Sequence, residues 1–227
     1  QPDAIDDASQ QIAAYMARLV ADKRSRPGQD LLSDLVAVRD AGDQLDDAEL
    51  VSMATLLLVA GHETTTNLIG NGTLALLSDP DSLAALRADP GLLPSAVEEL
   101  LRYNPPAATA TFRWTTEPVH LGDVVIPADQ VVMISLAAAN HDPAMFPDPG
   151  ELDLDRDTGG HLAFGYGIHY CLGAPLARME ARIAFHQVLA RLPDLSLACD
   201  PAALRWRHTR LMRGLEHLPV TFTATNH

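Results

Sequence analysis

Apolar positions recur at the spacing of an α-helix in five segments of the chain. The first segment covers residues 4–26, and residues 30–39 predict a second, shorter helix before a polar turn at residues 40–43. A long apolar segment then runs over residues 46–77. At 1.5 Å per residue, its roughly 32 residues predict a helix of about 48 Å.

Side chains at two helix starts predict capping boxes, in which each of two side chains bonds the backbone N–H of the other residue. Asp46 and Glu49 have this spacing at the start of the long helix. Ser95 and Glu98 have it at the start of a fourth helix, which Pro105-Pro106 ends. We therefore expect both helices to begin at these boxes.

Alternation with a period of two replaces the helical spacing further along the chain. Residues 118–127 predict a β-hairpin with a tight Gly-Asp turn, and residues 130–136 predict a further strand. Residues 141–160 are rich in Pro, Asp and Gly and predict a long irregular segment. Residues 174–192 predict a last helix with proline in its first turn, and residues 195–223 contain short stretches compatible with strands. The predicted fold class is mainly α with small β-sheets.

Composition narrows the range of partners. The chain has 227 residues, of which 47% are hydrophobic, so it can form a sizeable core. Its formal net charge of −14 argues against nucleic acid or an anionic membrane surface as a partner. Polar residues 62–67 interrupt the long helix, which argues against a transmembrane span. No secretory signal is visible, so a cytoplasmic location is expected.

Candidate chemistry centres on the segment FGYGIHYCLGAP, residues 164–175. Cys171 precedes the last predicted helix, whose free N–H groups and dipole favour a thiolate over a thiol. Neighbouring glycines let the backbone approach a ligand closely. Cys171 is therefore predicted to be an anionic sulfur ligand or a nucleophile rather than only a small buried hydrophobe.

Other kinds of site fit this segment less well. A zinc site of His161, His169 and Cys171 lacks a fourth ligand at the usual spacing. A cysteine hydrolase needs a base beside the sulfur, and the sequence leaves the geometry of His169 open. The glycines do not complete a dinucleotide-binding pattern, and the HETTT segment at residues 62–66 lacks the second histidine of a zinc protease helix.

Two further segments carry weaker signals. AGHETT, residues 60–65, places an acid and hydroxyls within an apolar helix. It is compatible with a kink at which threonines bond back to helix carbonyls and equally with a proton relay. Glu99 and Arg102 share a helix face and can pair, as many surface residues do.

Together and in this order, these segments resemble the cytochrome P-450 superfamily of haem-thiolate monooxygenases, in its soluble bacterial form. The motifs of that family match the cysteine segment, AGHETT, the Glu99–Arg102 pair and the segment FPDPGELDLDR, which ends at Arg156. Complete members are nearly twice as long. Residues 1–227 are therefore expected to be the C-terminal portion of one catalytic domain, with a long central helix, a cysteine loop and a proximal helix.

The resemblance implies a haem b cofactor (iron protoporphyrin IX) with Cys171 as its iron ligand. The other residues that it implies for cofactor binding are His169, Arg113, Phe164, Gly165, Gly167, Gly173, Ala60 and Gly61. His169 and Arg113 would pair with the haem propionates, and Phe164 would shield the ligand loop. Ala60 and Gly61 would let the long helix pass close to the haem.

The resemblance also implies roles away from the cysteine. Glu63 and Thr64 would deliver protons to dioxygen. Glu99, Arg102 and Arg156 would form a buried structural network. Residues of two segments would line an apolar substrate pocket: Ala107, Thr109, Ala110, Leu211 and Met212.

The activity implied is insertion of one oxygen atom of O2 into an apolar organic substrate, with electrons from a ferredoxin and its reductase. Residues 161–227 carry a net charge of +3, and Arg178, Arg182 and Arg191 in this region could attract an acidic ferredoxin. A second chain or an N-terminal part would cover apolar faces. A hydrogen-peroxide-using relative is one alternative, and a non-catalytic scaffold that activates a partner protein is another. Retention of Cys171 with Glu63 and Thr64 argues against the scaffold.

Overall fold

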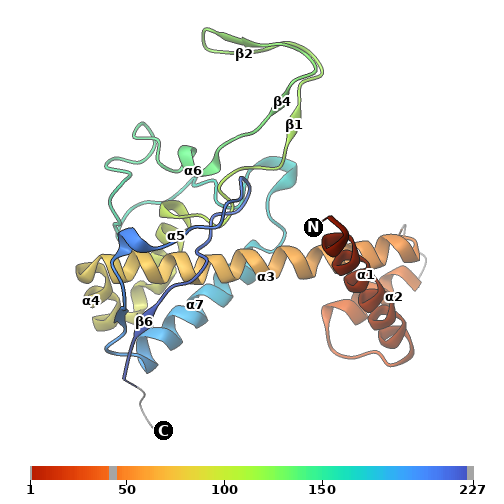
Figure 1. The fold of residues 1–227 in the computed structure, drawn as a ribbon, viewed down its shortest axis with the longest axis horizontal. Coiled ribbons are helices and arrows are strands. Elements are labelled where there is room, and N and C mark those ends of the chain that lie inside the picture. The colour runs from red at the N-terminus through yellow and green to blue at the C-terminus, as the bar shows by residue number, and fades with distance from the viewer. Residues whose placement is uncertain (1, 41–44, 224–227) are drawn as a thin grey trace. The chain divides into compact units, whose positions relative to one another are not determined.

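The computed structural model describes residues 2–40 and 45–223 (Figure 1). They divide into two compact units, residues 1–63 and residues 64–227. The main helices are α1 (Pro2–Ser25), α2 (Leu31–Asp40), α3 (Asp47–Ser78), α4 (Pro80–Ala88), α5 (Leu93–Tyr103), α6 (Leu136–Ala139) and α7 (Ala174–Arg191). Three two-stranded sheets accompany them. The predicted fold class is confirmed, whereas the assignment of the whole chain to one domain stays a prediction.

The first unit contains α1, α2 and the beginning of α3. Val20, Val36 and Leu50, one from each helix, form its buried core. The capping box predicted at the start of α3 is confirmed: the Asp46 N–H donates to Glu49 Oε2 at 2.8 Å, and the Glu49 N–H donates to Asp46 Oδ1 at 2.8 Å. Of the polar turn predicted over residues 40–43, only Asp40 lies within the described residues, and it ends α2.

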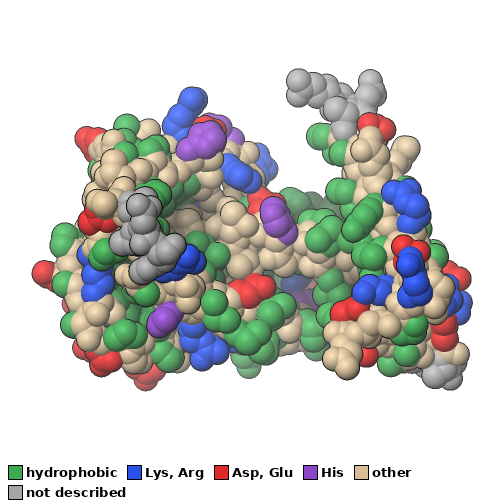
Figure 2. Space-filling model, turned by 90° about the horizontal axis from the view of Figure 1, so that it is seen from below, with side chains coloured by type: hydrophobic (Ala, Val, Ile, Leu, Met, Phe, Trp, Pro, Cys, Tyr) green, Lys and Arg blue, Asp and Glu red, His purple; other side chains and the backbone are tan. Residues whose placement is uncertain are grey.

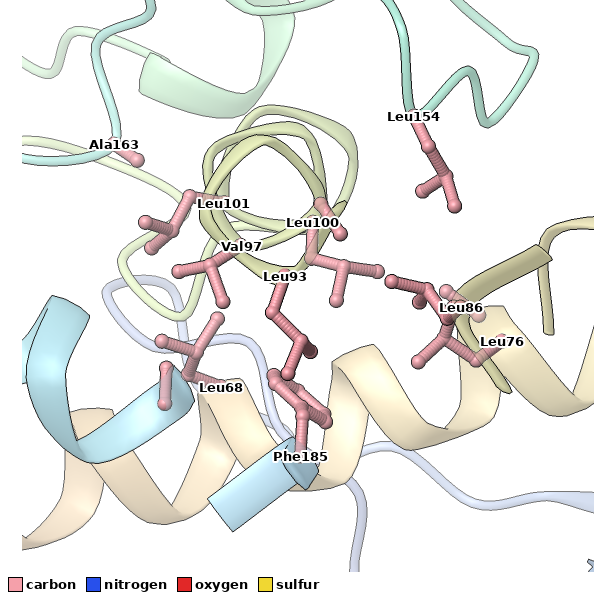
Figure 3. Close-up of a cluster of buried hydrophobic side chains, with 13 residues drawn as sticks. Leu68, Leu76, Leu86, Leu93, Val97, Leu100, Leu101, Leu154, Ala163 and Phe185 are labelled. Carbon is pink, nitrogen blue, oxygen red and sulfur yellow. The ribbon is translucent and has the colours of Figure 1, made fainter. Parts of the chain in front are cut away.

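The second unit has its core where α5 packs against α3, α4 and α7 (Figure 3). One face of α5 supplies Leu93, Val97, Leu100 and Leu101, all of which are buried. Figure 3 shows these side chains turned toward Leu68 and Leu76 of α3, Leu86 of α4 and Phe185 of α7. This core fixes α5, which carries both of the charged clusters described below.

Gly72 marks the closest approach of α3 to its neighbours in this core. A Cβ atom at Gly72 would lie 2.5 Å from Phe185 Cζ and 3.2 Å from Leu100 Cδ1. Both neighbours are fully buried and cannot move aside without disturbing the core. The absence of a side chain at residue 72 is therefore what allows α3, α5 and α7 to meet.

The small sheets are all antiparallel. β2 (Val119–Leu121) and β3 (Val124–Ile126) form the predicted hairpin, with Gly122 at a φ of +55° in its turn. β1 (Arg113–Trp114) pairs with β4 (Val131–Val132). β5 (Ser196–Leu197) pairs with β6 (Val220–Thr221), which places strands in the tail as predicted.

The strand predicted over residues 130–136 is confirmed only at Val131 and Val132. Ser135 forms an isolated antiparallel bridge with Thr109 instead of continuing the strand. Ser135 accepts a hydrogen bond from the Ala138 N–H at 3.1 Å and so caps α6. A serine that caps a helix start outweighs the strand preference of the apolar residues before it.

Two helix boundaries also differ from the prediction. Pro80 does end α3, but it is also the first residue of α4, whose N-cap Asp79 accepts from the Ser82 N–H at 3.1 Å. The helix predicted to begin at a Ser95–Glu98 box instead begins at Leu93. The Ser95 hydroxyl donates to the Leu92 carbonyl at 3.0 Å, so it does not cap the helix.

Residues 141–160 contain no helix or strand, as predicted, and every one of them lies within the described part of the chain. Within residues 2–40 and 45–223, no helix has both the length and the apolar character that crossing a membrane requires.

Replacing Gly72 with alanine should lower the free energy of unfolding by about 1–3 kcal/mol, because the added methyl group overpacks the core. Gly70 on the same helix is the matched control, since no atom lies within 4 Å of a Cβ built there. Gly70→Ala should be neutral or stabilising by up to about 1 kcal/mol, because alanine favours helix. Urea unfolding followed by circular dichroism compares the two, and equal stability of both variants would contradict the close approach.

Candidate functional site

The cysteine segment folds as a tight loop before α7. Gly165 and Gly167 have φ angles of +73° and +74°, a region that side chains with a Cβ rarely adopt. The Cys171 N–H donates to the Phe164 carbonyl at 2.9 Å and closes the loop. Gly173 lies at the N-terminus of α7, where a Cβ would be 3.9 Å from Cys171 Sγ. The sulfur therefore lies next to the N-terminus of α7, the end of a helix that carries the positive dipole charge.

The outward side of this loop is apolar. Tyr166, Ile168 and Leu172 are 88%, 98% and 84% exposed, whereas Cys171 is half-buried. Figure 2 shows hydrophobic side chains reaching the surface beside charged ones on the face that it presents. A soft sulfur donor within an apolar surface suits a flat, mostly apolar ligand that carries a metal ion. Haem has these properties, so the residues of the loop fit it.

Glu99, Arg102 and Arg156 come together beneath the irregular segment. Glu99 and Arg102 are completely buried and form a two-pronged pair, with Nε–Oε2 at 2.6 Å and Nη2–Oε1 at 2.7 Å. Arg156 Nε donates to Glu99 Oε1 at 3.2 Å, and the Asp153 N–H donates to the same oxygen at 3.1 Å. One buried carboxylate thus binds two guanidinium groups and a backbone amide.

The two arginines also hold the carbonyl groups of the irregular segment. Arg102 donates to the carbonyls of Asn140 at 2.9 Å, Pro149 at 3.0 Å and Glu151 at 3.2 Å. Arg156 donates to the Pro147 carbonyl as well. These carbonyls have no hydrogen-bond donors from a helix or a strand. The guanidinium groups therefore supply the donors that regular secondary structure supplies elsewhere. The network holds residues 140–156 to α5.

A second charged cluster lies on a neighbouring face of α5, and the sequence did not reveal it. Glu98 accepts two hydrogen bonds from Arg178 of α7, at 2.7 and 2.8 Å. It also bonds His161 Nε2 at 3.0 Å. These contacts correct one sequence-based prediction, because Glu98 is not part of a capping box. No local spacing in the sequence could have indicated this pairing, because Glu98 and Arg178 are 80 residues apart.

The cluster changes the acidity of Glu98. Partial burial would raise the pKa of this carboxyl, but the hydrogen bonds from His161 and Arg178 outweigh burial and lower the pKa from 4.5 to about 2. The pKa of Arg178 is raised, chiefly by its hydrogen bonds to Glu98. Both side chains are therefore ionised at neutral pH.

The residues predicted to line a substrate pocket are brought together by backbone pairing. Ala107 and Met212 form an antiparallel bridge, and Thr109 Oγ1 donates to the Arg210 carbonyl at 3.0 Å. Ala110 donates to the Ile134 carbonyl at 2.9 Å, and Leu211 is partly exposed. A separate cleft of about 550 Å³ between the ends of α3 and α5 is lined by none of the five predicted pocket residues.

The remaining predicted residues are distributed over both units. Ala60, Gly61 and Glu63 belong to the first unit, whereas Thr64 begins the second. The Arg113 side chain donates to the Thr111 hydroxyl at 2.6 Å and to its carbonyl at 2.9 Å. His169 ends the short 3-10 turn Gly167–His169 and is exposed.

Neither cysteine is in a disulfide. Over residues 2–40 and 45–223, no group of three or more His, Cys, Asp or Glu side chains is arranged to hold a metal ion.

Comparison with known proteins agrees with a haem-thiolate class of protein. A description of the cytochrome P-450 family matches residues 90–193. Cytochrome P-450 107B1 of Saccharopolyspora erythraea is 56% identical over 97% of this chain and 54% of its own length. The cytochrome P-450 monooxygenase PikC of Streptomyces venezuelae is 54% identical over 94% of this chain and 51% of its own length.

Solved structures agree with these relatives. The tirandamycin C-bound P-450 monooxygenase TamI superposes with a TM-score of 0.92 at 52% identity, over 98% of this chain and 56% of that one. The chain belongs to the cytochrome P-450 family and spans about half the length of the curated relatives it matches. Members of this family bind haem iron through a cysteine thiolate.

Stability should depend on the ionisation of Glu98. Because the folded-state pKa of Glu98 lies below that of the unfolded chain, its contribution is present above about pH 4.5 and is lost as the pH falls toward about 2. The difference in free energy of unfolding between the natural chain and Glu98→Gln should therefore shrink as the pH is lowered from about 6 to about 3. Urea titrations at several pH values measure this difference. A difference that stays constant over the range would contradict the ionised pair.

Proposed function

We propose that the polypeptide containing this chain is a haem-thiolate monooxygenase that inserts one atom of O2 into an apolar organic substrate, by hydroxylation or epoxidation. The observation that carries the proposal is the Cys171 loop, in which two left-handed glycines and the start of α7 present a sulfur within an apolar surface. Similar proteins support it: one is a vitamin D(3) 25-hydroxylase of Pseudonocardia autotrophica, 51% identical over 91% of this chain.

Cys171 holds the iron of haem b as its thiolate ligand. Bound in this way, the haem supplies the activation of dioxygen, which no amino-acid side chain can perform. The start of α7 stabilises the negative charge on Sγ. Gly165, Gly167 and Gly173 keep the loop free of side chains that would crowd this ligand, and Phe164 holds the Cys171 amide through its carbonyl. The loop thus presents one anionic sulfur in a fixed backbone setting.

Arg113 and His169 bind the carboxylate groups of the cofactor. A guanidinium group offers donors in a planar fork that matches a carboxylate. The Arg113 side chain is held by the Thr111 carbonyl and hydroxyl, which orients its remaining donors.

Ala60 and Gly61 are small, and nothing lies within 4 Å of a Cβ built at Gly61. They leave room for the flat ligand.

Glu63 and Thr64 carry protons to the dioxygen substrate. Glu63 would supply a carboxylate that can take up and release a proton, and Thr64 would supply a hydroxyl that can both accept and donate one. These roles rest on the match of residues 60–65 to the family's oxygen-activation motif. The same acid–alcohol pair favours a route that uses O2 over one that uses hydrogen peroxide.

The substrate is an apolar secondary metabolite bound against Ala107, Thr109, Ala110, Leu211 and Met212. These side chains are small or apolar, so the pocket gains affinity by excluding water from the substrate. One similar protein is named as the 6-deoxyerythronolide B hydroxylase of Saccharopolyspora erythraea, 47% identical over 94% of this chain. A ferredoxin and its reductase supply the electrons.

Replacing Cys171 with alanine should abolish the thiolate-type Soret band of the reduced carbon monoxide complex, because no other sulfur replaces the ligand. The measurement is a carbon monoxide difference spectrum of the full natural polypeptide. Cys199→Ala is the matched control and should keep the band, since this second free cysteine lies in another part of the fold. A thiolate band that survives in Cys171→Ala would overturn the ligand assignment. Its absence from the unsubstituted protein would favour a non-catalytic scaffold.

Replacing Thr64 with alanine should uncouple electron consumption from product, because the proton no longer reaches dioxygen. The ratio of product formed to NAD(P)H consumed should fall, because a positioned proton donor accelerates the productive step by about 10²–10⁴-fold. Thr55→Ala on the same helix is the control, since the Thr55 hydroxyl only bonds back to the Val51 carbonyl at 2.8 Å. Equal coupling in both variants would count against the relay.

A further inference from the structure

Glu98 and Arg178 form an ion pair between α5 and α7, the helix that directly follows the cysteine loop. Arg178 Nε and Nη2 donate to the two oxygens of Glu98 at 2.7 and 2.8 Å, in a fork-to-fork geometry. The two side chains are only 28% and 25% exposed. Partial burial reduces screening by water, so the pair is stronger than one on an open surface.

Arg178 also reaches both flanks of the loop that carries Cys171. Its guanidinium carbon lies 4.5 Å from the centre of the Phe164 ring, a cation–π contact. Its Nη1 donates to the Tyr170 hydroxyl at 3.2 Å. Tyr170 directly precedes Cys171, and the Phe164 carbonyl accepts from the Cys171 amide. One guanidinium group therefore restrains the residues that hold the ligand on either side.

His161 extends the cluster to the start of the loop. The Ala163 N–H donates to His161 Nδ1 at 3.2 Å, so Nδ1 is an acceptor and the ring proton lies on Nε2. Nε2 then donates to Glu98 Oε2 at 3.0 Å. The His161 ring lies 6.1 Å from that of Phe164, in a tilted arrangement. Glu98 thus ties the entry of the loop to α5 and to Arg178 together.

The arrangement differs from the Glu99 network in what it holds. Arg102 and Arg156, which pair with Glu99, donate to carbonyls of residues 140–151. Glu98, the preceding residue of α5, binds groups that lie at residues 161–178. Adjacent residues on a helix point in directions about 100° apart, so two neighbouring carboxylates serve two successive segments.

We propose that Glu98 and Arg178 are positioning residues that hold the backbone of the Cys171 loop in the geometry required of an iron ligand. This inference rests on the proposed haem-thiolate function. Under this proposal, Arg178 stabilises the cysteine loop rather than attracting a ferredoxin. The low pKa of Glu98 agrees with it, because an ionised carboxylate is what the guanidinium group and the imidazole N–H require.

The test uses Arg178→Lys and Glu98→Gln in the full natural polypeptide. Arg178→Lys keeps the charge but loses the planar fork, and with it the simultaneous contacts to Glu98, Phe164 and Tyr170. Arg182→Lys is the matched control: Arg182 lies one turn further along α7, is exposed, and donates only to the Arg178 backbone carbonyl at 3.2 Å. Urea unfolding of each variant establishes that it is folded before the comparison.

Two measurements report on the loop. One is hydrogen exchange at the Cys171 amide, which can be followed with or without haem. The other combines the rate of haem transfer to apomyoglobin with the fraction of the reduced carbon monoxide complex that has the thiolate-type band. In Arg178→Lys and Glu98→Gln, exchange and haem transfer should each be about tenfold faster, the expected effect of weakening a hydrogen bond between charged groups. The thiolate-type fraction should fall, and Arg182→Lys should match the natural protein.

Arg178→Lys and Glu98→Gln proteins that keep natural exchange rates, haem transfer and spectra would overturn the positioning role while leaving the haem-thiolate function intact. A natural polypeptide that shows no thiolate-type band would instead overturn the proposed function. In that case exchange at the Cys171 amide still decides whether the pair holds the loop.

Discussion

The buried carboxylate of Glu99 is the constraint on which the second unit depends. Removing a charge from water costs several kcal/mol unless it is paired and fully hydrogen-bonded. Here Arg102, Arg156 and the Asp153 amide satisfy it. The arginines in turn need acceptors, and they find them in the carbonyls of the irregular segment. The irregular segment is thereby held to α5 by hydrogen bonds from both arginines, and each arginine also pairs with Glu99.

Between the Glu99 network and Cys171, the backbone is restrained at several points. The irregular segment ends near His161, which the Glu98–Arg178 pair engages. The loop then turns at Gly165 and Gly167, the Cys171 amide closes on the Phe164 carbonyl, and α7 begins. The apolar face of α5 fixes the helix that carries both glutamates. Packing in the core therefore positions α5 and, through Glu98, the segment that leads to the cysteine loop.

Local signals predicted part of this arrangement, and tertiary partners decided the rest. The Asp46–Glu49 box was predictable because both of its partners lie within one helical turn. The Ser95–Glu98 box has the same spacing, but the prediction was wrong because Arg178 and His161 compete for the Glu98 carboxylate. Pro80 ends one helix and starts the next, since Asp79 caps α4. The glycines and the helix start beside Cys171 predicted a sulfur ligand or nucleophile, whereas the specific roles of Cys171, Glu63 and Thr64 toward haem and dioxygen came from the resemblance to a family.

We propose that Cys171 of this cytochrome P-450 chain is the ligand of a haem iron. Iron K-edge X-ray absorption of the haem-loaded natural polypeptide tests it most directly, because the fine structure distinguishes sulfur from nitrogen and oxygen neighbours. We predict one sulfur atom in the first coordination shell of the iron, and its loss in Cys171→Ala. A first shell that contains only nitrogen and oxygen in the unsubstituted protein would contradict the account.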